Sequence, residues 1–433
     1  MDQCTLFGTK LFFIIKIFFF YISFCSALVD ISSHTQMRYG SIIGTVVCRP
    51  ITGSSRFPLP SSRENFLVRQ PVSSKVYYVI TNEMDDCACV ETVLGRTKLS
   101  ALGRCLTHEH LALDFDKFYV PPPRQIEEYF RGNIDLGNVG FIKQYPYSSA
   151  CNVAFNDEET HSAVLEDVRL YKKFGGGTIV ENTSHGLKRD ISLMKRISRD
   201  TGVHVIVGTG HYVAVTQSPD TLRIAEEKLY ELIVKEMTVG CEEYPSVKAG
   251  IVGEVGSSWP MHDFERTAIR AAARAQSELN APVTFHPGRN SEAPFEILRI
   301  YLEAGGGAKK AIMSHLDRTI LKEDDLLEFS KIGCYCQFDL FGTECSFYQL
   351  DESTDMPSDS QRIERIKLLR DEGCLDRVLM SHDIHTKHRL VKYGGHGYAH
   401  IINNVIPKMR IKGFSDREID LVTIENPRAW LTG

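Results

Sequence analysis

Two histidines separated by one residue are the first candidates for chemistry in this 433-residue chain. They are His108 and His110, in the segment Thr107-His108-Glu109-His110. Alternate side chains of an extended segment point to the same face, so both imidazoles should face one way and Glu109 the other. Neutral imidazole is the commonest nitrogen ligand of divalent transition metals. One such pair is weak evidence, because two hydrogen-bonded histidines near a turn would give the same pattern.

Four more ligand-type side chains each close or interrupt a short apolar run. They are His286, His315, Asp383 and Glu254. The Asp383 carboxylate could bind a metal with one oxygen and take a proton from water with the other. Glu254 lies in a glycine-rich apolar run, where an unpaired carboxylate would be costly to bury unless it bridged metal ions. Taken singly, each histidine could be a buried hydrogen-bonded residue, and Asp383 could be the N-cap of a helix.

The elements that would position these residues form a repeating pattern of a short apolar run followed by an amphipathic stretch. Amphipathic stretches with helical spacing occupy residues 158–174, 222–237, 264–279 and 362–372. The alternation predicts parallel strands joined by right-handed helical crossovers, and eight such units close a barrel. The eight predicted strands are Arg104 to His108, Thr178 to Glu181, Val203 to Gly208, Ala249 to Glu254, Pro282 to His286, Ala311 to His315, Gly333 to Phe338 and Val378 to Asp383.

The positions of the polar residues favour a barrel over a doubly wound sheet. Most runs end in, or lead directly into, a polar residue, Glu181 included, and in a (β/α)8 barrel the carboxyl ends of the strands converge on one mouth. The same residues would spread along the edge of an open sheet. We therefore predict an α/β fold, a (β/α)8 TIM barrel with a binuclear metal site at its C-terminal mouth. Such a site holds two divalent cations that share a hydroxide, and hydrolysis is its natural reaction. Zinc suits the mixed nitrogen and oxygen ligands best, and manganese, cobalt or iron would also fit.

An ordered set of motifs covering about residues 88–433 resembles the phosphotriesterase family of the amidohydrolase superfamily. The resemblance implies that His108 and His110 bind a buried metal with Asp383, that His286 and His315 bind an outer metal, and that Glu254 bridges the two. Bacterial phosphotriesterases carry a carboxylated lysine at the bridge, so Glu254 places efficient phosphotriester turnover in doubt. The motifs are Gly103 to His110, Gly253 to Gly256, Phe285 to Arg289, Ser314 to Thr319, Ser381 to Asp383 and Glu425 to Arg428.

The branch of the family with Glu at the bridge resembles amidases that act on small N-acyl compounds such as N-acetyltaurine. We therefore expect the bridging hydroxide to attack the acyl carbonyl while Asp383 passes a proton to the leaving amine. Arg289 is the candidate for the anionic end of the substrate, and Tyr212 and His396 are candidates for shaping the pocket. The other five histidines considered, His185, His382, His385, His388 and His400, are expected not to be ligands. The alternatives are a lactonase or phosphotriesterase-type esterase, and a metal-binding scaffold barrel without activity.

Composition limits the partners and the domain organisation. The formal net charge of −5 leaves no basic excess for nucleic acid, so the expected partner is a small-molecule substrate; a homodimer is compatible with the chain. Twelve cysteines without any Cys-x-x-Cys pair are expected to be mostly free thiols. The apolar stretch from Leu11 to Val29 predicts a signal peptide or signal-anchor over residues 1–27, unless it is a non-functional extension. Residues 28–87 are expected to be a disordered leader, and residues 88–433 the barrel. Localisation would be cytoplasmic by the resemblance, or secretory if residues 1–27 are a functional signal peptide; membrane attachment requires an anchor at residues 11–29.

Overall fold

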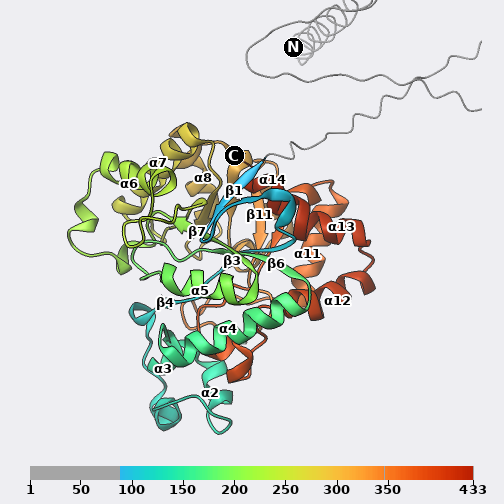
Figure 1. Ribbon diagram of the computed structural model, residues 1–433. Helices are drawn as coiled ribbons and strands as arrows, with labels where there is room; N and C mark the ends of the chain where they lie inside the picture. The colour runs from blue at the N-terminus through green and yellow to red at the C-terminus, as the bar shows by residue number, and fades with distance from the viewer. Residues whose placement is uncertain (1–87, 346, 433) are drawn as a thin grey trace, which may run out of the picture. The chain divides into compact units, whose positions relative to one another are not determined.

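The computed structural model describes residues 88–345 and 347–432, which fold as an eight-stranded barrel surrounded by helices (Figure 1). The expectations for residues 1–27 and 28–87 lie outside the described residues. Within the described part of the chain, no helix combines the length and the apolarity needed to cross a bilayer. The eight cysteines of this part are all free thiols, as expected.

All eight predicted strands are present, and each pairs in parallel with the next along the chain. The first and last strands meet where the Asp383 amide, just after β12, donates to the His108 carbonyl oxygen at 3.2 Å. The predicted TIM barrel is therefore confirmed. The strands are β3 (Arg104–Glu109), β6 (Gly176–Glu181), β7 (His204–Thr209), β8 (Ile251–Gly256), β9 (Val283–His286), β10 (Ala311–Met313), β11 (Tyr335–Phe338) and β12 (Val378–Met380).

Helices join successive strands and form the outer layer (Figure 1). The crossover helices, in chain order, are α4 (Glu158–Lys173), α5 (Ile191–Thr201), α6 (Glu226–Thr238), α7 (Asp263–Leu279), α8 (Ala293–Glu303), α9 (Leu316–Thr319), α10 (Glu323–Ser330) and α11 (Asp359–Asp371). The chain ends with α12 (Ile406–Ile411), α13 (Asp416–Asp420) and α14 (Asn426–Leu431).

Two helices begin at residues other than those that the apolar periodicity predicts. Helix α11 begins three residues before the predicted Arg362 because Ser358 caps it and forms a capping box with Gln361. The predicted helix over residues 222–237 starts late, at Glu226, because the chain is extended at Ile224 and Ala225. Local backbone geometry at a helix start therefore accounts for both differences.

The barrel interior is layered along its axis. At the amino ends of the strands an apolar layer packs against the hairpin of β1 (Cys89–Thr92) and β2 (Gly95–Lys98) and against Trp430. Two residues further along the strands the layer is polar: Thr107 donates to Gln337 at 2.6 Å, and Gln337 donates to Ser314 at 3.0 Å. The candidate metal ligands follow at the carboxyl ends. The polar layer therefore separates the ligands from the apolar base, which consists of Cys105, Val180, Ile206, Ile251, Ile312, Tyr335 and Leu379.

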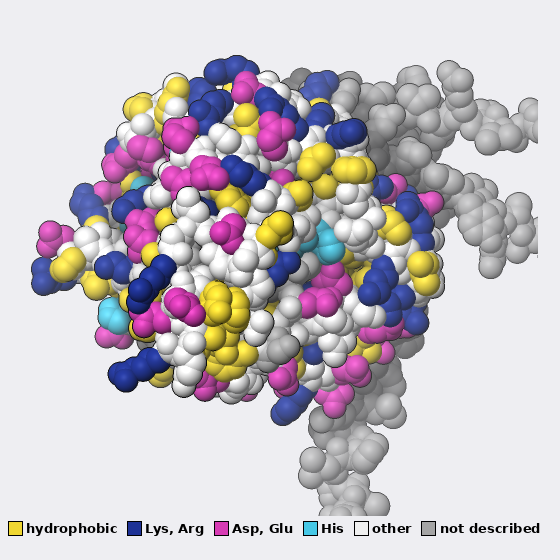
Figure 2. All heavy atoms as spheres, turned by 90° about the horizontal axis from the view of Figure 1, so that it is seen from below, with side chains coloured by type: hydrophobic (Ala, Val, Ile, Leu, Met, Phe, Trp, Pro, Cys, Tyr) yellow, Lys and Arg dark blue, Asp and Glu magenta, His cyan; other side chains and the backbone are white. Residues whose placement is uncertain are grey.

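The long connection between β3 and α4 contains β4 (Leu113–Asp114), α2 (Val139–Gln144), α3 (Ala150–Val153) and β5 (Ala154–Phe155). It brings Phe115 and Tyr147 to the cavity at the mouth of the barrel. The face on the α2 and α3 side mixes Lys and Arg with Asp and Glu side chains (Figure 2). This connection therefore supplies part of the pocket wall in addition to the strand ends.

Candidate active site

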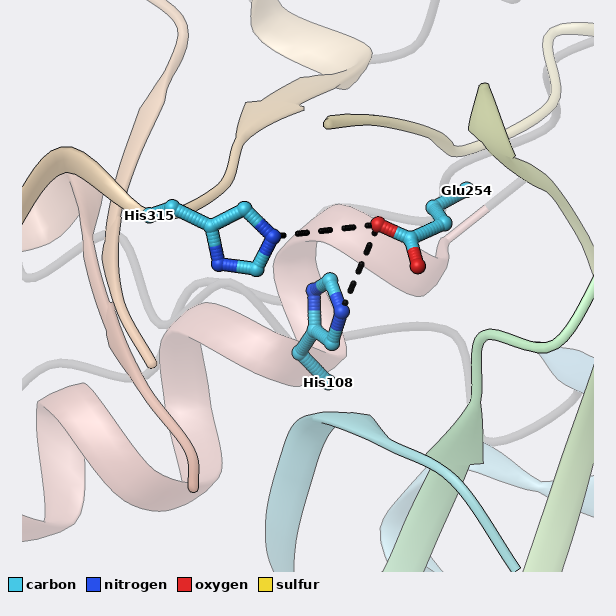
Figure 3. A group of neighbouring side chains, drawn as sticks. All are labelled: His108, Glu254 and His315. Atoms are coloured by element: carbon cyan, nitrogen blue, oxygen red, sulfur yellow. Dashed lines mark ion pairs between the residues drawn. The ribbon is translucent and has the colours of Figure 1, made fainter. Parts of the chain in front are cut away.

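The six residues predicted as metal ligands lie together at the C-terminal mouth of the barrel. His108, His110 and Asp383 form one group, in which the candidate ligand atoms lie within 4.8 Å of one another. His108, Glu254 and His315 form a second group on the same criterion (Figure 3). The six side chains come from β3 and the residue after it, from β8 and β9, and from the segments after β10 and β12. The two groups share His108, so they form one continuous cluster.

The first group surrounds one oxygen of Asp383. Its Oδ1 lies 3.2 Å from His110 Nε2 and 3.7 Å from His108 Nε2. Asp383 has φ 54°, a left-handed conformation that is unusual for a residue other than glycine. His108 Nε2 is buried and has no hydrogen-bond partner among the described residues. A buried unpartnered nitrogen aimed at a carboxylate is the arrangement expected of a metal ligand.

The second group surrounds Glu254. Its Oε2 lies 3.5 Å from His108 Nε2, 3.2 Å from His286 Nδ1 and 3.8 Å from His315 Nε2, while its Oε1 lies 3.5 Å from His110 Nε2. Glu254 thus faces histidines of both predicted metal sites. His286 Nδ1 is 2.9 Å from His315 Nε2, so both ring nitrogens face the same space beside Glu254 Oε2.

The electrostatics of the cluster suit a divalent cation. Burial alone would raise the pKa of Glu254, but His108 and His286 beside it hold the pKa well below its usual range. Burial would also raise the pKa of Asp383, but the neighbouring His385 and His110 outweigh this effect and hold the pKa well below its usual range. Burial lowers the pKa of His286 to about 3, which leaves a neutral ring. Burial would also lower the pKa of His108, but the carboxylates of Glu254 and Asp339 raise it to about 10, and Asp339 likewise raises the pKa of His315. Two ionised carboxylates among four histidine rings supply the nitrogen and oxygen donors that transition-metal ions bind.

A buried carboxylate that the sequence reasoning passed over holds His315 in place. Asp339 Oδ1 lies 2.7 Å from His315 Nδ1 and accepts the His315 backbone N–H at 3.0 Å. Its Oδ2 accepts from Gln337 at 2.9 Å and lies 3.3 Å from His108 Nδ1. Asp339 therefore orients histidines from both groups. The sequence does contain a signal for Asp339, because this residue directly follows the last apolar residue of the seventh predicted strand, as the candidate ligands follow theirs.

Other polar residues fix the remaining rings. His110 Nδ1 lies 2.9 Å from the Thr183 hydroxyl, and His108 Nδ1 lies 3.0 Å from the Ser314 hydroxyl. Glu181, which ends the second strand, accepts from Thr183 instead of joining the ligand cluster. Such contacts to the second ring nitrogen leave the first nitrogen free to bind a metal.

Glu109 faces the opposite way from His108 and His110, as the alternation of side chains along β3 predicts, and it forms hydrogen bonds with the segment after β12. The Glu109 side chain points away from the cluster and accepts from the Ser381 hydroxyl and the His382 amide at 2.8 and 2.9 Å. His385, set aside in the sequence reasoning, lies with Nδ1 3.2 Å from Asp383 Oδ2 and Nε2 3.1 Å from the Tyr147 hydroxyl. His385 therefore contacts the candidate catalytic carboxylate directly.

A cavity lies over the cluster and is lined by three arginines, Arg289, Arg318 and Arg389. None of them forms an ion pair with a carboxylate within the described chain; Arg289 donates to the Tyr348 hydroxyl at 3.0 Å, and Arg389 donates to the Asp383 carbonyl oxygen at 2.6 Å. Guanidinium groups without carboxylate partners at a pocket wall are available to an anionic ligand.

The three predicted substrate contacts lie in different places. Arg289 lines the cavity over the cluster, and the Tyr212 hydroxyl lies 3.3 Å from both nitrogens of His286. His396 lines a neighbouring cavity and stacks on His382 with ring centroids 5.6 Å apart. The loop after β12 carries His396 past the mouth, and no periodicity in the sequence reports the course of such a loop.

The barrel and its cluster of histidines and carboxylates define a TIM-barrel hydrolase with residues placed to hold metal ions. The sequence model of the phosphotriesterase family matches residues 88–431. The chain therefore belongs to the phosphotriesterase family, and it is a metal-dependent hydrolase.

Similar proteins agree with this assignment. The phosphotriesterase-related protein of Aedes aegypti is 56% identical over 336 residues, which is 76% of this chain and 94% of that protein. That of Drosophila melanogaster is 51% identical over 343 residues, or 79% and 98% of the two chains. A resiniferatoxin-binding protein from Rhodobacter sphaeroides superposes with a TM-score of 0.76 at 29% identity, covering 79% of this chain and 95% of that one. The phosphotriesterase homology protein of Escherichia coli, solved with phosphate in its active site, has a TM-score of 0.62 at 25% identity, with 76% and 99% coverage.

Proposed function

We propose that this protein is an amidase that hydrolyses small N-acyl compounds with an anionic end, of the N-acetyltaurine type. The observation that carries the proposal is the wall of three arginines over the candidate metal-ligand cluster, none of which pairs with a carboxylate of residues 88–345 or 347–432. The phosphate in the active site of the Escherichia coli relative also supports an anion in this pocket.

Two divalent ions, zinc in the first instance, would be held by His108, His110, Asp383, Glu254, His286 and His315. When bound, they supply Lewis-acid chemistry that lowers the pKa of water and polarises the carbonyl group. The chain's own residues position the substrate: Arg289 would bind its sulfonate or carboxylate, and Tyr212 beside His286 would confine the acyl group. Glu254 would keep the two sites together through its two oxygens.

Asp383 would move the proton of the reaction. Its Oδ1 faces the histidines, while Oδ2 lies 3.2 Å from His385 Nδ1. Arg389 donates to the Asp383 carbonyl oxygen and fixes its backbone. Asp383 would take a proton from the attacking water and deliver it to the nitrogen of the leaving amine, which departs as a neutral amine.

The substrate class is tested with the metal-loaded full chain on N-acetyltaurine and on N-ethylacetamide, which lacks the sulfonate. Two charge-assisted hydrogen bonds to Arg289 predict that kcat/KM for N-acetyltaurine exceeds that for the neutral amide by roughly 100-fold. Arg289→Met should lower kcat/KM for N-acetyltaurine by about tenfold or more and leave the neutral amide unchanged. Preferential turnover of a lactone or an aryl phosphotriester would replace this proposal with the esterase alternative.

The role of Asp383 is tested with Asp383→Asn, with metal content measured on the same preparation. A lost proton carrier predicts a fall in kcat of roughly 100- to 10,000-fold. Turnover that is retained with unchanged metal content would remove Asp383 from this role. Absence of hydrolysis on every substrate together with less than about one ion per chain would favour the scaffold alternative.

A further inference from the structure

A series of hydrogen bonds connects a buried carboxylate of β6 to the candidate ligand His110. Glu181 is the last residue of β6, and Thr183 follows two residues later. The Thr183 hydroxyl lies 2.5 Å from Glu181 Oε1 and 2.9 Å from His110 Nδ1. Glu181 and Thr183 are fully buried, and His110 is only 3% exposed. The three side chains therefore form a continuous buried contact between β6 and the ligand cluster.

The direction of the first hydrogen bond follows from the groups around Glu181. Both of its oxygens face backbone donors: the Leu111 amide donates to Oε1 and the Thr183 amide donates to Oε2, each at 3.1 Å. Burial raises the pKa of Glu181 to about 7, and the hydrogen bonds act in the opposite direction. An ionised carboxylate can only accept, so above this pH the Thr183 hydroxyl donates its single hydrogen to Glu181.

The direction of the second hydrogen bond follows from the first. The Ala112 carbonyl oxygen, 3.4 Å from the Thr183 hydroxyl, is also an acceptor, so the hydroxyl hydrogen points away from His110 in either case. The Thr183 oxygen must then accept from His110 Nδ1, which carries the hydrogen of the neutral ring. His110 Nε2 keeps a free electron pair, and this nitrogen faces Asp383 Oδ1 at 3.2 Å.

The backbone of His110 is held separately from its ring. Glu181 Oε1 accepts the amide of Leu111, the next residue, and the Tyr398 hydroxyl donates to the His110 carbonyl oxygen at 2.6 Å. Tyr398 is fully buried and belongs to the loop after β12. Because these contacts do not use the Thr183 hydroxyl, its removal should change the state of the ring and leave the backbone of His110 in place.

We propose that Glu181 and Thr183 are positioning residues that set the tautomer of His110 and so raise its affinity for the metal ion it would share with His108 and Asp383. Glu181 directs the Thr183 hydroxyl, the Thr183 oxygen takes the hydrogen of His110 Nδ1, and Nε2 is left to bind the metal. Neither residue is among the six candidate ligands. The proposal rests on the metal-binding role of His110 in the proposed function, and it does not depend on the substrate.

The first experiment is competition for zinc between the full chain and a chromophoric chelator at pH 8, where Glu181 is ionised. Thr183→Val keeps the shape of the side chain but cannot accept a hydrogen bond, so it should raise the zinc Kd roughly 10- to 100-fold. Thr183→Ser restores the hydroxyl and should return the Kd to within about threefold of wild type.

Thr178→Val is the matched control, because it makes the same change in the same strand at the end away from the ligands. The buried Thr178 hydroxyl donates to the Leu102 carbonyl oxygen at 2.6 Å. Loss of this contact should leave the zinc Kd within about threefold of wild type.

The second experiment reads the tautomer directly in the metal-free protein. Nitrogen-15 spectra of histidine-labelled protein report which ring nitrogen carries the hydrogen, and the spectrum of His110→Gln assigns the His110 signals. The hydrogen should lie on Nδ1 in the wild type, and this preference should be lost in Thr183→Val and in Glu181→Gln. Melting temperatures check that all variants fold, and Thr183→Val remains informative if Glu181→Gln does not fold.

Three results would overturn the proposal: a zinc Kd of Thr183→Val equal to that of the wild type, an equal loss of affinity in Thr178→Val, or a hydrogen on Nε2 of His110 in the metal-free wild type. Hydrolysis of N-acetyltaurine is measured on the same preparations. The expected loss of zinc affinity in Thr183→Val without hydrolysis by the wild type would refute the proposed function alone. Hydrolysis by the wild type with the same zinc Kd in every variant would refute this proposal alone.

Discussion

Substituting Asp339 by Asn should weaken metal binding without unfolding the barrel. The Asp339 carboxylate accepts from His315 Nδ1 and the His315 amide, accepts from Gln337, and lies beside His108 Nδ1. An asparagine of the same shape keeps one acceptor oxygen but places an NH2 group against the Gln337 NH2 group or the His315 ring. At least one charge-assisted hydrogen bond, about 1.5–3 kcal/mol, is lost. This corresponds to a metal affinity roughly 10- to 100-fold lower, as is typical for the partners of metal-ligating histidines.

The assay is competition for zinc between the protein and a chromophoric chelator, with metal content per chain measured after dialysis. Asp324→Asn, in the first turn of α10, is the matched control, because it makes the same chemical change far from the ligand contacts. The melting temperature of the metal-free variant separates an effect on metal affinity from an effect on folding. A zinc Kd for Asp339→Asn equal to that of Asp324→Asn would refute the view that Asp339 positions His315.

Two further predictions concern stability. Arg362 is fully buried and donates to Asp317 at 2.8 Å and to Asp359 at 3.0 Å. Arg362→Met leaves the buried Asp317 carboxylate without its positive partner and should lower the free energy of unfolding in urea by about 3–5 kcal/mol, and a loss below about 1 kcal/mol would contradict this. Burial raises the pKa of Asp167 from 3.8 to about 6, so its contribution to stability is present below pH 3.8 and is lost as pH rises through about 6. Asp167→Asn, whose oxygen can still accept the Val391 amide, should gain stability relative to wild type by up to about 3 kcal/mol between pH 4 and 7. A difference that does not change with pH would show that folding leaves the pKa of Asp167 unshifted.

The strands were predictable because each is a short apolar run, and the cluster of candidate ligands was predictable because its members close or interrupt such runs. His286 is the last residue of β9, and His315 lies two residues after β10; both strands are fully buried, and a buried polar residue there needs hydrogen-bond or metal partners. Asp339 was predictable by the same rule, and it was missed only because the seventh run ends in Phe338, an apolar residue that offers no ligand.

Contacts made by loops could not be predicted in the same way. Tyr147 belongs to the long connection after β3, and His385 belongs to an irregular segment, so neither position follows from a period of 2 or 3.6. Their meeting at 3.1 Å depends on how two loops pack, far apart in sequence. The same limit applies to His396, whose cavity depends on the loops after both β11 and β12.

The contact that joins the two ends of the barrel has a consequence for synthesis. The amide of Asp383 donates to the carbonyl oxygen of His108, so the hydrogen bond that closes the barrel joins two residues of the ligand cluster. A chain emerging from the ribosome has His108, His110 and Glu254 long before Asp383, and until the segment after β12 is made the histidines lack the second of the two carboxylates that face them. Zinc capture should therefore come late, after nearly the whole chain is synthesised, and ribosome-bound chains that end before β12 should retain little metal.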